Sequence, residues 1–194
     1  MSMSKIILGY STPKEWVEAV LADFDAFLQD HAAAEKKASG MAVSMLSHYP
    51  DRVELVSAMA ELAVEELIHY REVVKIIHER GNITQKDEKD AYVIEFRQSL
   101  RKHSNEYFLD RLLIGGIIEA RGAERFGMIA KALDPGKLQQ FYQSITDSEV
   151  RHQNLMVDIA EIYFPEEEVR QRLDQLIDIE ANIVSHLPFR AALH

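Results

Sequence analysis

The chain has 194 residues, of which 47 % are apolar, and a formal net charge of −10 at pH 7. This length and composition are typical of one globular domain over residues 1–194, and they exclude a disordered chain. The absence of cysteine excludes disulfides, zinc–thiolate sites, iron–sulfur clusters and cysteine nucleophiles. The acidic balance argues against non-specific nucleic-acid binding, although it is compatible with local basic patches.

The N-terminal stretch gives no targeting signal. Its only apolar run, Ile6–Leu8, is too short for the apolar region of a signal peptide. No run in the chain approaches the roughly 20 apolar residues that a membrane-spanning helix requires. Together with the missing cysteines, this predicts a cytoplasmic protein without membrane association.

The first fifty residues predict two helices. Thr12, Pro13 and Glu15 form a helix-start signal, in which Thr12 caps and Glu15 completes a capping box. Apolar residues then recur at helical spacing until the chain reaches Pro50. One bent helix fits this pattern, and so does a short helix followed by a long one. We favour the second arrangement, with a break near Asp23.

Five further segments follow in order. Asp51 is expected to cap a helix that includes residues 55–76 and ends at Gly81. Residues 82–90 are predicted to be a loop, residues 91–103 a helix with a basic end, and residues 104–107 a weak break. Helices are then expected over residues 108–133, 137–164 and 166–186, separated by a turn at 134–136 and by Pro165. No β pattern is present, so the chain is predicted to be all-α.

Two copies of one motif lie on the four longest predicted helices. Glu35 precedes Glu66-x-x-His69, and Glu119 precedes Glu149-x-x-His152, at nearly equal separations. Residues three apart on a helix share a face, so each Glu and His of a pair can reach one centre. This is the ligand set of ferritin-like di-iron carboxylate bundles. The prediction is a ferritin-like four-helix bundle with additional N-terminal, connecting and C-terminal helices.

The donor types favour two divalent cations. Four carboxylates in one bundle core would repel each other, and their desolvation is costly unless cations compensate it. Imidazole and carboxylate ligands suit iron or manganese. A single Glu-x-x-His is weak support because most such pairs lie on helix surfaces. The repeat, with a preceding Glu in each copy, is much stronger support.

Several neighbours of these ligands have two interpretations. Glu65 could accept the second N–H of His69, or be a solvated charge, and Ser148 holds the equivalent place before His152. His31 shares a face with Glu35, although an ordinary boundary histidine is the favoured interpretation.

The helix predicted over residues 108–133 carries two further features. Gly115 and Gly116 precede Glu119 by about one turn, which indicates either a channel for dioxygen and substrate or a close helix contact. Glu124, with its neighbours Arg121 and Arg125, is expected to form an ion network.

The residues around the ligands resemble one known family. The stretches 30–38, 65–69, 118–126 and 148–152 resemble bacterial tRNA 2-methylthio-N6-isopentenyladenosine hydroxylases, over nearly the whole chain. The family often has Cys where this chain has Ala34, and Ser-Cys where it has Gly122 and Ala123. Neither position is a metal ligand in the family pattern.

The resemblance implies a non-haem di-iron monooxygenase. Two iron ions, dioxygen and two electrons from an external reductase would serve to hydroxylate the isopentenyl side chain of the modified tRNA nucleoside. Glu66 and Glu149 would bridge the metals, and Glu35 and Glu119 would be terminal ligands. We expect a monomer or a small homo-oligomer.

A tRNA substrate requires phosphate contacts. The basic edge 97–103 is the first choice, because Arg97 and Arg101 are four residues apart and would share a helix face. The other candidates are Lys36, Lys37, Arg121, Arg125 and Arg151.

Two hypotheses compete with the tRNA hydroxylase. One is a ferritin-like iron-oxidising or iron-handling protein without an organic substrate, and the other is a helical interaction module whose Glu-x-x-His pairs are incidental.

Overall fold

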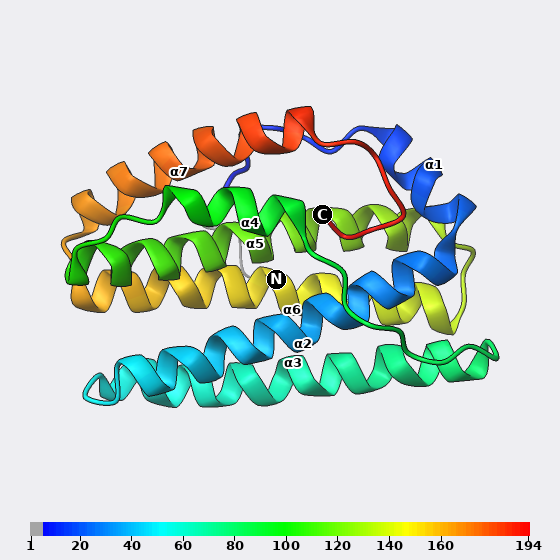
Figure 1. The fold of residues 1–194 in the computed structure, drawn as a ribbon, viewed down its shortest axis with the longest axis horizontal. Coiled ribbons are helices and arrows are strands. Elements are labelled where there is room, and N and C mark those ends of the chain that lie inside the picture. The colour runs from blue at the N-terminus through cyan, green and yellow to red at the C-terminus, as the bar shows by residue number, and fades with distance from the viewer. Residues whose placement is uncertain (1–5) are drawn as a thin grey trace. The chain divides into compact units, whose positions relative to one another are not determined.

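The computed structural model describes residues 6–194, and every regular element in that range is a helix (Figure 1). The helices are α1 (Lys14–Ala22), α2 (Phe24–His48), α3 (Val53–Glu79), α4 (Ala91–Phe96), α5 (Ser104–Ala132), α6 (Lys137–Tyr163) and α7 (Glu166–His186), with a 3-10 turn at Arg97–Ser99. Residues 1–5, which belong to the N-terminal stretch considered for a targeting signal, lie outside the described residues. Within residues 6–194, no helix combines the length and apolar character needed to span a membrane.

The chain divides into two compact units. The α2–α3 unit comprises residues 18–89 and 189–193. The α5–α6 unit comprises the N-terminal segment up to Val17, residues 90–188, and His194, and it includes α4 and α7. The expectation of one domain over 1–194 stays a prediction.

The α2–α3 unit is a helical hairpin in which the two long helices lie side by side (Figure 1). The predicted break is confirmed, because the Asp23 carboxylate accepts the backbone N–H of Ala26 at 3.1 Å and starts α2. Gly81 ends α3 with a φ of 81°, and its N–H donates to the carbonyl of His78. Only glycine adopts this left-handed conformation without strain, so the predicted helix stop is also confirmed.

The start of α3 differs from the prediction. Its N-cap residue is Arg52, which makes no side-chain cap, so Asp51 is not the cap. The reason is a turn in which the N–H of Arg52 donates to the carbonyl of Tyr49 at 3.2 Å. That turn places Asp51 one position too early to reach the first free amides of the helix.

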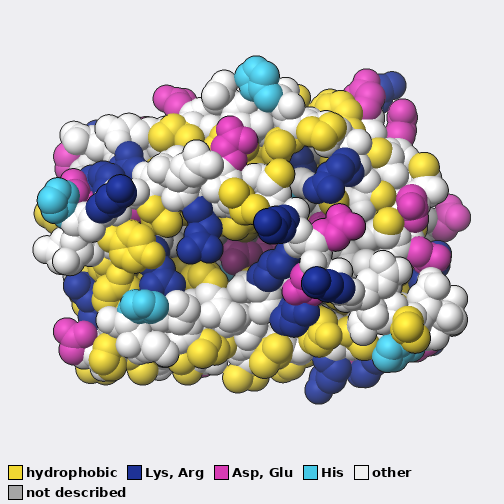
Figure 2. Space-filling model, in the orientation of Figure 1, with side chains coloured by type: hydrophobic (Ala, Val, Ile, Leu, Met, Phe, Trp, Pro, Cys, Tyr) yellow, Lys and Arg dark blue, Asp and Glu magenta, His cyan; other side chains and the backbone are white. Residues whose placement is uncertain are grey.

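The outer surface of α3 is partly apolar. Val64, Leu67 and Ile68 are 59 %, 50 % and 42 % exposed. Figure 2 shows hydrophobic side chains along the edge of the molecule where α3 lies. The helix is therefore apolar over more than the face that it buries against α2.

In the α5–α6 unit, α5 packs along α6, and α7 contacts α4, α5 and α6 (Figure 1). The predicted helices 137–164 and 166–186 are confirmed to within one residue. The predicted helix over 91–103 begins at Ala91 as expected, but its predicted end is wrong, because regular structure ends at Ser99 and Leu100 is extended. The weak break expected at 104–107 is wrong as well, since α5 begins at Ser104.

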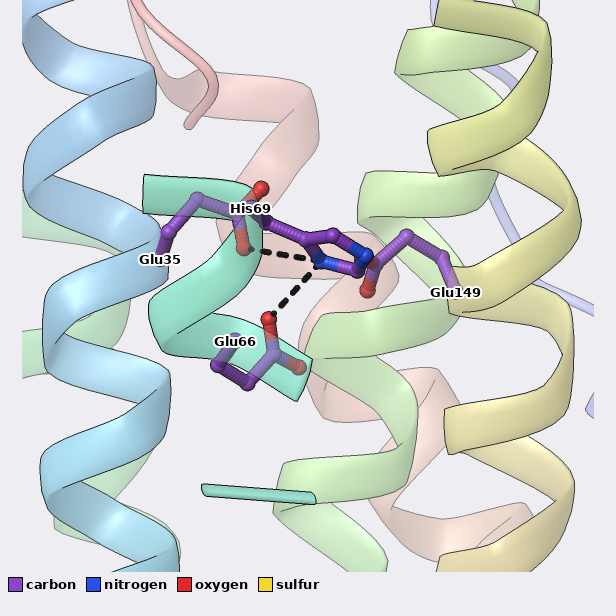
Figure 3. Close-up of side chains that lie close together, drawn as sticks. All are labelled: Glu35, Glu66, His69 and Glu149. Carbon is purple, nitrogen blue, oxygen red and sulfur yellow. Dashed lines mark hydrogen bonds and ion pairs between the residues drawn. The ribbon is translucent and has the colours of Figure 1, made fainter. Parts of the chain in front are cut away.

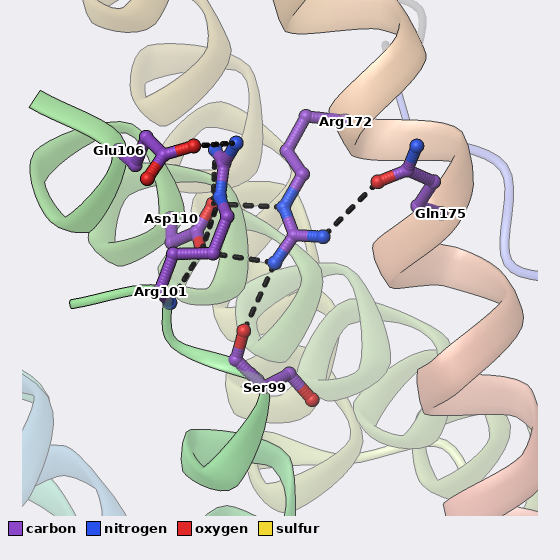
Figure 4. A network of polar contacts seen from close by, with 6 residues as sticks. All are labelled: Ser99, Arg101, Glu106, Asp110, Arg172 and Gln175. Atoms are coloured by element: carbon purple, nitrogen blue, oxygen red, sulfur yellow. Dashed lines mark hydrogen bonds and ion pairs between the residues drawn. The ribbon is translucent and has the colours of Figure 1, made fainter. Parts of the chain in front are cut away.

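A buried carboxylate explains why helical structure stops at Ser99 (Figure 4). Asp110 is 0 % exposed and accepts the backbone N–H and the side chain of Arg101. It also accepts two N–H groups of Arg172 from α7, and Arg172 donates a third hydrogen bond to the carbonyl of Ser99. Arg101 is therefore held in an extended connection instead of continuing a helix.

Candidate metal centre

Three predicted ligands come together in the α2–α3 unit. Glu35 lies on α2, and Glu66 and His69 lie three apart on α3. Figure 3 shows the three side chains pointing toward one another. His69 Nδ1 lies 3.5 Å from Glu35 Oε2 and 3.3 Å from Glu66 Oε2. All three residues are buried, at 4 %, 1 % and 9 % exposure, and we call them the first triad.

His31 is part of the surroundings of this triad. Its side chain is 0 % exposed, and its Nε2 lies 2.6 Å from Oε1 of Glu35, one turn further along α2. The favoured interpretation of an ordinary boundary histidine is therefore wrong. The spacing to Glu35 was visible in the sequence, but periodicity alone does not distinguish a half-buried position from a fully buried one.

The electrostatics of the first triad favour a cation. Burial alone would lower the pKa of His69, but hydrogen bonds and charge from Glu35 and Glu66 outweigh burial and raise it to about 10. Burial, aided by the charge of His69, lowers the pKa of His31 to about 3, so His31 is neutral at pH 7. The two carboxylates therefore concentrate negative charge at one point in a desolvated environment.

The α5–α6 unit contains a second triad of the same composition. Glu119 lies on α5, and Glu149 and His152 lie three apart on α6. Each of the three side chains offers a ligand atom, and these atoms lie within 4.8 Å of one another. His152 Nδ1 is 3.8 Å from Glu149 Oε2, and all three residues are buried. The structure thus repeats, in each unit, the arrangement that the two sequence motifs predicted.

The donor sets fit a divalent transition metal. Each triad supplies two carboxylates and one imidazole, which are ligands that suit iron and manganese. In the first triad the donor atoms also lie within 4.8 Å of one another. Buried carboxylates at this density require compensation by protons or cations. The chemistry and spacing of the donors are therefore compatible with a metal at each triad.

Ser148 lies beside His152 as expected. Its Oγ is 3.4 Å from His152 Nε2, and it accepts a hydrogen bond from Nη2 of Arg151 at 2.9 Å. Glu65, for which a similar role toward His69 was considered, is half-buried. That role stays a prediction.

The glycines before Glu119 have a packing reason at one position. A Cβ at Gly116 would lie 3.1 Å from both Ile6 Cδ1 and Met156 Cβ, which is closer than ordinary contact. Of the two interpretations left open by the sequence, close helix packing therefore holds for Gly116. Gly122, which follows Glu119 on the same helix, is less tightly packed, because a Cβ there would lie 3.8 Å from Glu149 Oε2, at ordinary contact distance.

The ion network predicted on α5 is confirmed and is larger than expected. Arg121 is 0 % exposed and binds Glu180 of α7, Glu124 and the carbonyl of Tyr10. Thr12 does not cap α1, because its hydroxyl donates to Glu124 at 2.6 Å and accepts from Arg121. Glu180 was missed, although its position on the apolar stripe of α7 is a signal that the sequence contains.

Arg125 is also bound by residues of the protein, including Thr12 of this network. Its Nε donates to the Thr12 hydroxyl at 3.3 Å, and its guanidinium stacks over the ring of Trp16. The partners of Arg121 and Arg125 are thus internal to the protein. Neither is available as a phosphate contact.

Other basic residues proposed for RNA are also engaged by the protein. Arg101 is bound by Asp110 and Glu106. In the α2–α3 unit, Lys36 pairs with Asp87 at 2.7 Å and Lys37 donates to the carbonyl of Glu88 at 3.1 Å. The premise that Arg97 and Arg101 share a helix face is wrong, because Arg101 lies beyond the 3-10 turn. RNA contacts by the exposed basic residues stay a prediction.

Comparison with known proteins identifies the family. The family described as tRNA-(MS[2]IO[6]A)-hydroxylase (MiaE) matches the chain over residues 1–194. This chain belongs to that family. A relative from Pseudomonas putida, named tRNA 2-(methylsulfanyl)-N(6)-isopentenyladenosine(37) hydroxylase, is 32 % identical and aligns with 91 % of this chain and 86 % of its own length. A protein of the same name from Salmonella typhimurium is 28 % identical over 92 % of this chain and 68 % of its own length.

A solved structure supports the fold class. The protein, described as protein 43 with aldehyde deformylating oxygenase activity from Synechococcus, has a TM-score of 0.91 and 32 % identity to this member of the hydroxylase family. The likeness covers 96 % of this chain and 94 % of that one. It confirms the predicted all-α, ferritin-like fold.

Proposed function

We propose that this chain is a di-iron monooxygenase that hydroxylates the isopentenyl side chain of 2-methylthio-N6-isopentenyladenosine in tRNA. The family match over residues 1–194 carries the substrate assignment. The two buried triads support the metal assignment, since each combines two carboxylates with one imidazole. In this proposal Glu35, Glu66, His69, Glu119, Glu149 and His152 together hold two iron ions.

The reaction needs co-reactants that the chain does not contain. One oxygen atom of dioxygen enters the substrate as a hydroxyl group, and the other leaves as water. Two electrons and two protons complete this balance, and an external reductase supplies the electrons. When bound, iron supplies the oxygen activation that breaks an allylic C–H bond.

The residues of the chain have distinct tasks in this scheme. Glu35 and Glu66, with His69, would hold iron in the first triad, and Glu119 and Glu149, with His152, would hold iron in the second. His31 holds the carboxylate of Glu35 through its 2.6 Å contact, which keeps that ligand oriented before the metal arrives. Modified tRNA is the partner substrate, and we place the reaction in the cytoplasm.

Reconstitution tests this proposal. Untagged protein loaded with iron(II) would be incubated with tRNA that carries the isopentenyl nucleoside, together with dioxygen and a reducing system. We expect the hydroxylated nucleoside, detected by mass spectrometry after digestion, with one oxygen atom incorporated from labelled dioxygen. The Glu149→Ala variant should give none. Iron-loaded, reducible protein that leaves the nucleoside unchanged would contradict the substrate assignment.

Aldehyde deformylation is a second candidate. It is favoured by the structural likeness to a Synechococcus protein described with that activity, at 32 % identity. The same preparation incubated with a fatty aldehyde would release formate and a hydrocarbon if this candidate were correct. Formate release without nucleoside hydroxylation would contradict our proposal and support aldehyde deformylation instead.

The sequence also left open an iron-oxidising protein without an organic substrate. Such a protein would consume dioxygen with iron(II) alone and take up far more iron than two ions per chain. The measurement is the iron capacity of the purified protein together with its oligomeric state. A monomer or small oligomer that saturates at about two irons per chain excludes storage.

A further inference from the structure

Beside the second triad, the two nitrogens of the His152 ring face different partners. Nδ1 lies 3.8 Å from the carboxylate of Glu149, and Nε2 lies 3.4 Å from the hydroxyl oxygen of Ser148. Both His152 and Ser148 are 2 % exposed, so their geometry is set by the protein and not by solvent. The ring is thus held with one nitrogen toward the triad and the other toward a buried hydroxyl group.

The hydroxyl group is itself held by Arg151. Nη2 of Arg151 donates to Ser148 Oγ at 2.9 Å, and Nη1 donates to the carbonyl of Asp147 at 3.1 Å. A guanidinium can only donate, so Ser148 Oγ must be an acceptor in this contact. The second lone pair of a hydroxyl oxygen can accept one more hydrogen bond. His152 Nε2, at 3.4 Å, is within reach of this lone pair.

From these contacts we propose that Ser148 is a positioning residue for His152 and that Arg151 fixes the orientation of Ser148. A neutral histidine that binds a metal through Nδ1 must carry its proton on Nε2. Ser148 Oγ is placed to accept that N–H, which favours the ligand tautomer and fixes the plane of the ring. Arg151, whose side chain is exposed, extends this chain of contacts from the ligand to the surface of α6.

The inference rests on the proposed function, because it assigns a metal to His152. It adds a role that the family match and the donor sets do not give. A hydrogen-bond partner of a metal-ligating histidine typically contributes about 10–100-fold to metal affinity. Removing the Ser148 hydroxyl should therefore weaken metal binding without removing a ligand.

Cobalt(II) titration tests the inference without tRNA or turnover. Bound cobalt absorbs visible light with an intensity that depends on ligand geometry, so it reports both affinity and ring orientation. We expect Ser148→Ala to weaken cobalt affinity by about 10–100-fold and to change the spectrum. Ser148→Thr, which keeps a hydroxyl group, should restore both. Ser144→Ala, at an exposed position one turn earlier on α6, is the matched control and should behave as wild type.

Arg151 is tested by a double variant. If it acts through Ser148, Arg151→Met should weaken cobalt binding less than Ser148→Ala, and the two changes together should be no worse than Ser148→Ala alone. Wild-type affinity and spectrum in folded Ser148→Ala protein would overturn the inference while leaving the proposed function standing. Additive effects of the two changes would overturn the role of Arg151. Wild-type protein that binds no cobalt would overturn both the inference and the proposed metal centre.

Discussion

Arg121 of α5 binds Glu180 of α7 through two nitrogens, with Nε 2.8 Å from Oε1 and Nη2 3.0 Å from Oε2. Both side chains are 0 % exposed, and Tyr92 donates its hydroxyl to the same carboxylate at 3.2 Å. Arg121 lies two residues after the predicted ligand Glu119. The pair therefore fixes, relative to α7, the turn of α5 that carries this predicted ligand.

Breaking this pair should destabilise the protein strongly. Glu180→Leu leaves the Arg121 charge buried without its main partner, which typically costs about 3–5 kcal/mol. Adding Arg121→Met should recover part of the loss, because an apolar pair of similar volume has no uncompensated charge. Urea unfolding measures the free energy of unfolding of the single and the double variant. Glu167→Gln, which breaks an exposed pair with Arg170 on the same helix, is the control and should produce no measurable change. Equal stability of Glu180→Leu and wild type would contradict this account.

Two glycines of α5 should respond differently to the same substitution. Gly116→Ala places a methyl group 3.1 Å from Met156 Cβ, whereas Gly122→Ala places one 3.7 Å from Phe126. Both changes gain about 1 kcal/mol of helix propensity, so the difference between their free energies of unfolding isolates packing. We expect Gly116→Ala to be the less stable variant by about 1–3 kcal/mol. Equal free energies would mean that α6 shifts freely at this contact.

Asp110 should make stability depend on pH in the acid range. Burial alone would raise the pKa of Asp110, but hydrogen bonds from Arg172 and Arg101 outweigh burial and hold that pKa below its ordinary value. A carboxyl group with a lowered folded-state pKa stabilises the protein above about pH 4, and this contribution is lost as the pH falls through the folded-state pKa.

The corresponding variant is Asp110→Asn, which lacks the titrating group. Urea unfolding between pH 7 and pH 3 should show a large stability difference from wild type at neutral pH. The difference should narrow below about pH 4 as wild type loses the contribution of Asp110. A stability difference between wild type and Asp110→Asn that stays constant from pH 7 to pH 3 would rule out Asp110 as the source of the pH dependence.

The sequence predicted the features that depend on local pattern. Pro165 and Gly81 end helices for steric reasons that need no tertiary contact, so the end of α6, the start of α7 and the end of α3 were predicted well. The six predicted ligands came from the repeated motif, because residues three apart must share a helix face, and their binding of metal stays a prediction. The triads within each unit then followed directly from these helices.

Two of the failures share one physical cause, which is a polar partner brought by another part of the chain. Thr12 looks like a helix cap until Glu124, 112 residues later, takes its hydroxyl group. Arg101 looks like part of a helix until Asp110 and Arg172 hold the connection in an extended form. Periodicity gives the face on which a residue lies, but it does not give the polar partner that the other elements bring.

The ligand assignment predicts the iron content of variants. Untagged wild-type protein should bind about two irons per chain, measured by elemental analysis after removal of free metal. Glu66→Ala and Glu149→Ala should each abolish binding, because each removes a predicted bridging carboxylate from one triad. Glu61→Ala, at an exposed position on α3, is the matched control and should retain both irons. Iron retained by the Glu66 and Glu149 variants would show that the triads are incidental.

The most direct test of the whole account is nucleoside analysis of tRNA from cells with and without the gene. We predict that cells lacking it accumulate the isopentenyl nucleoside and contain none of the hydroxylated form. Wild-type protein supplied from a plasmid should restore hydroxylation, and the Glu66→Ala variant, produced at the same level, should not. Hydroxylated nucleoside at an unchanged level in the deletion strain would contradict the assignment of this chain as the tRNA hydroxylase.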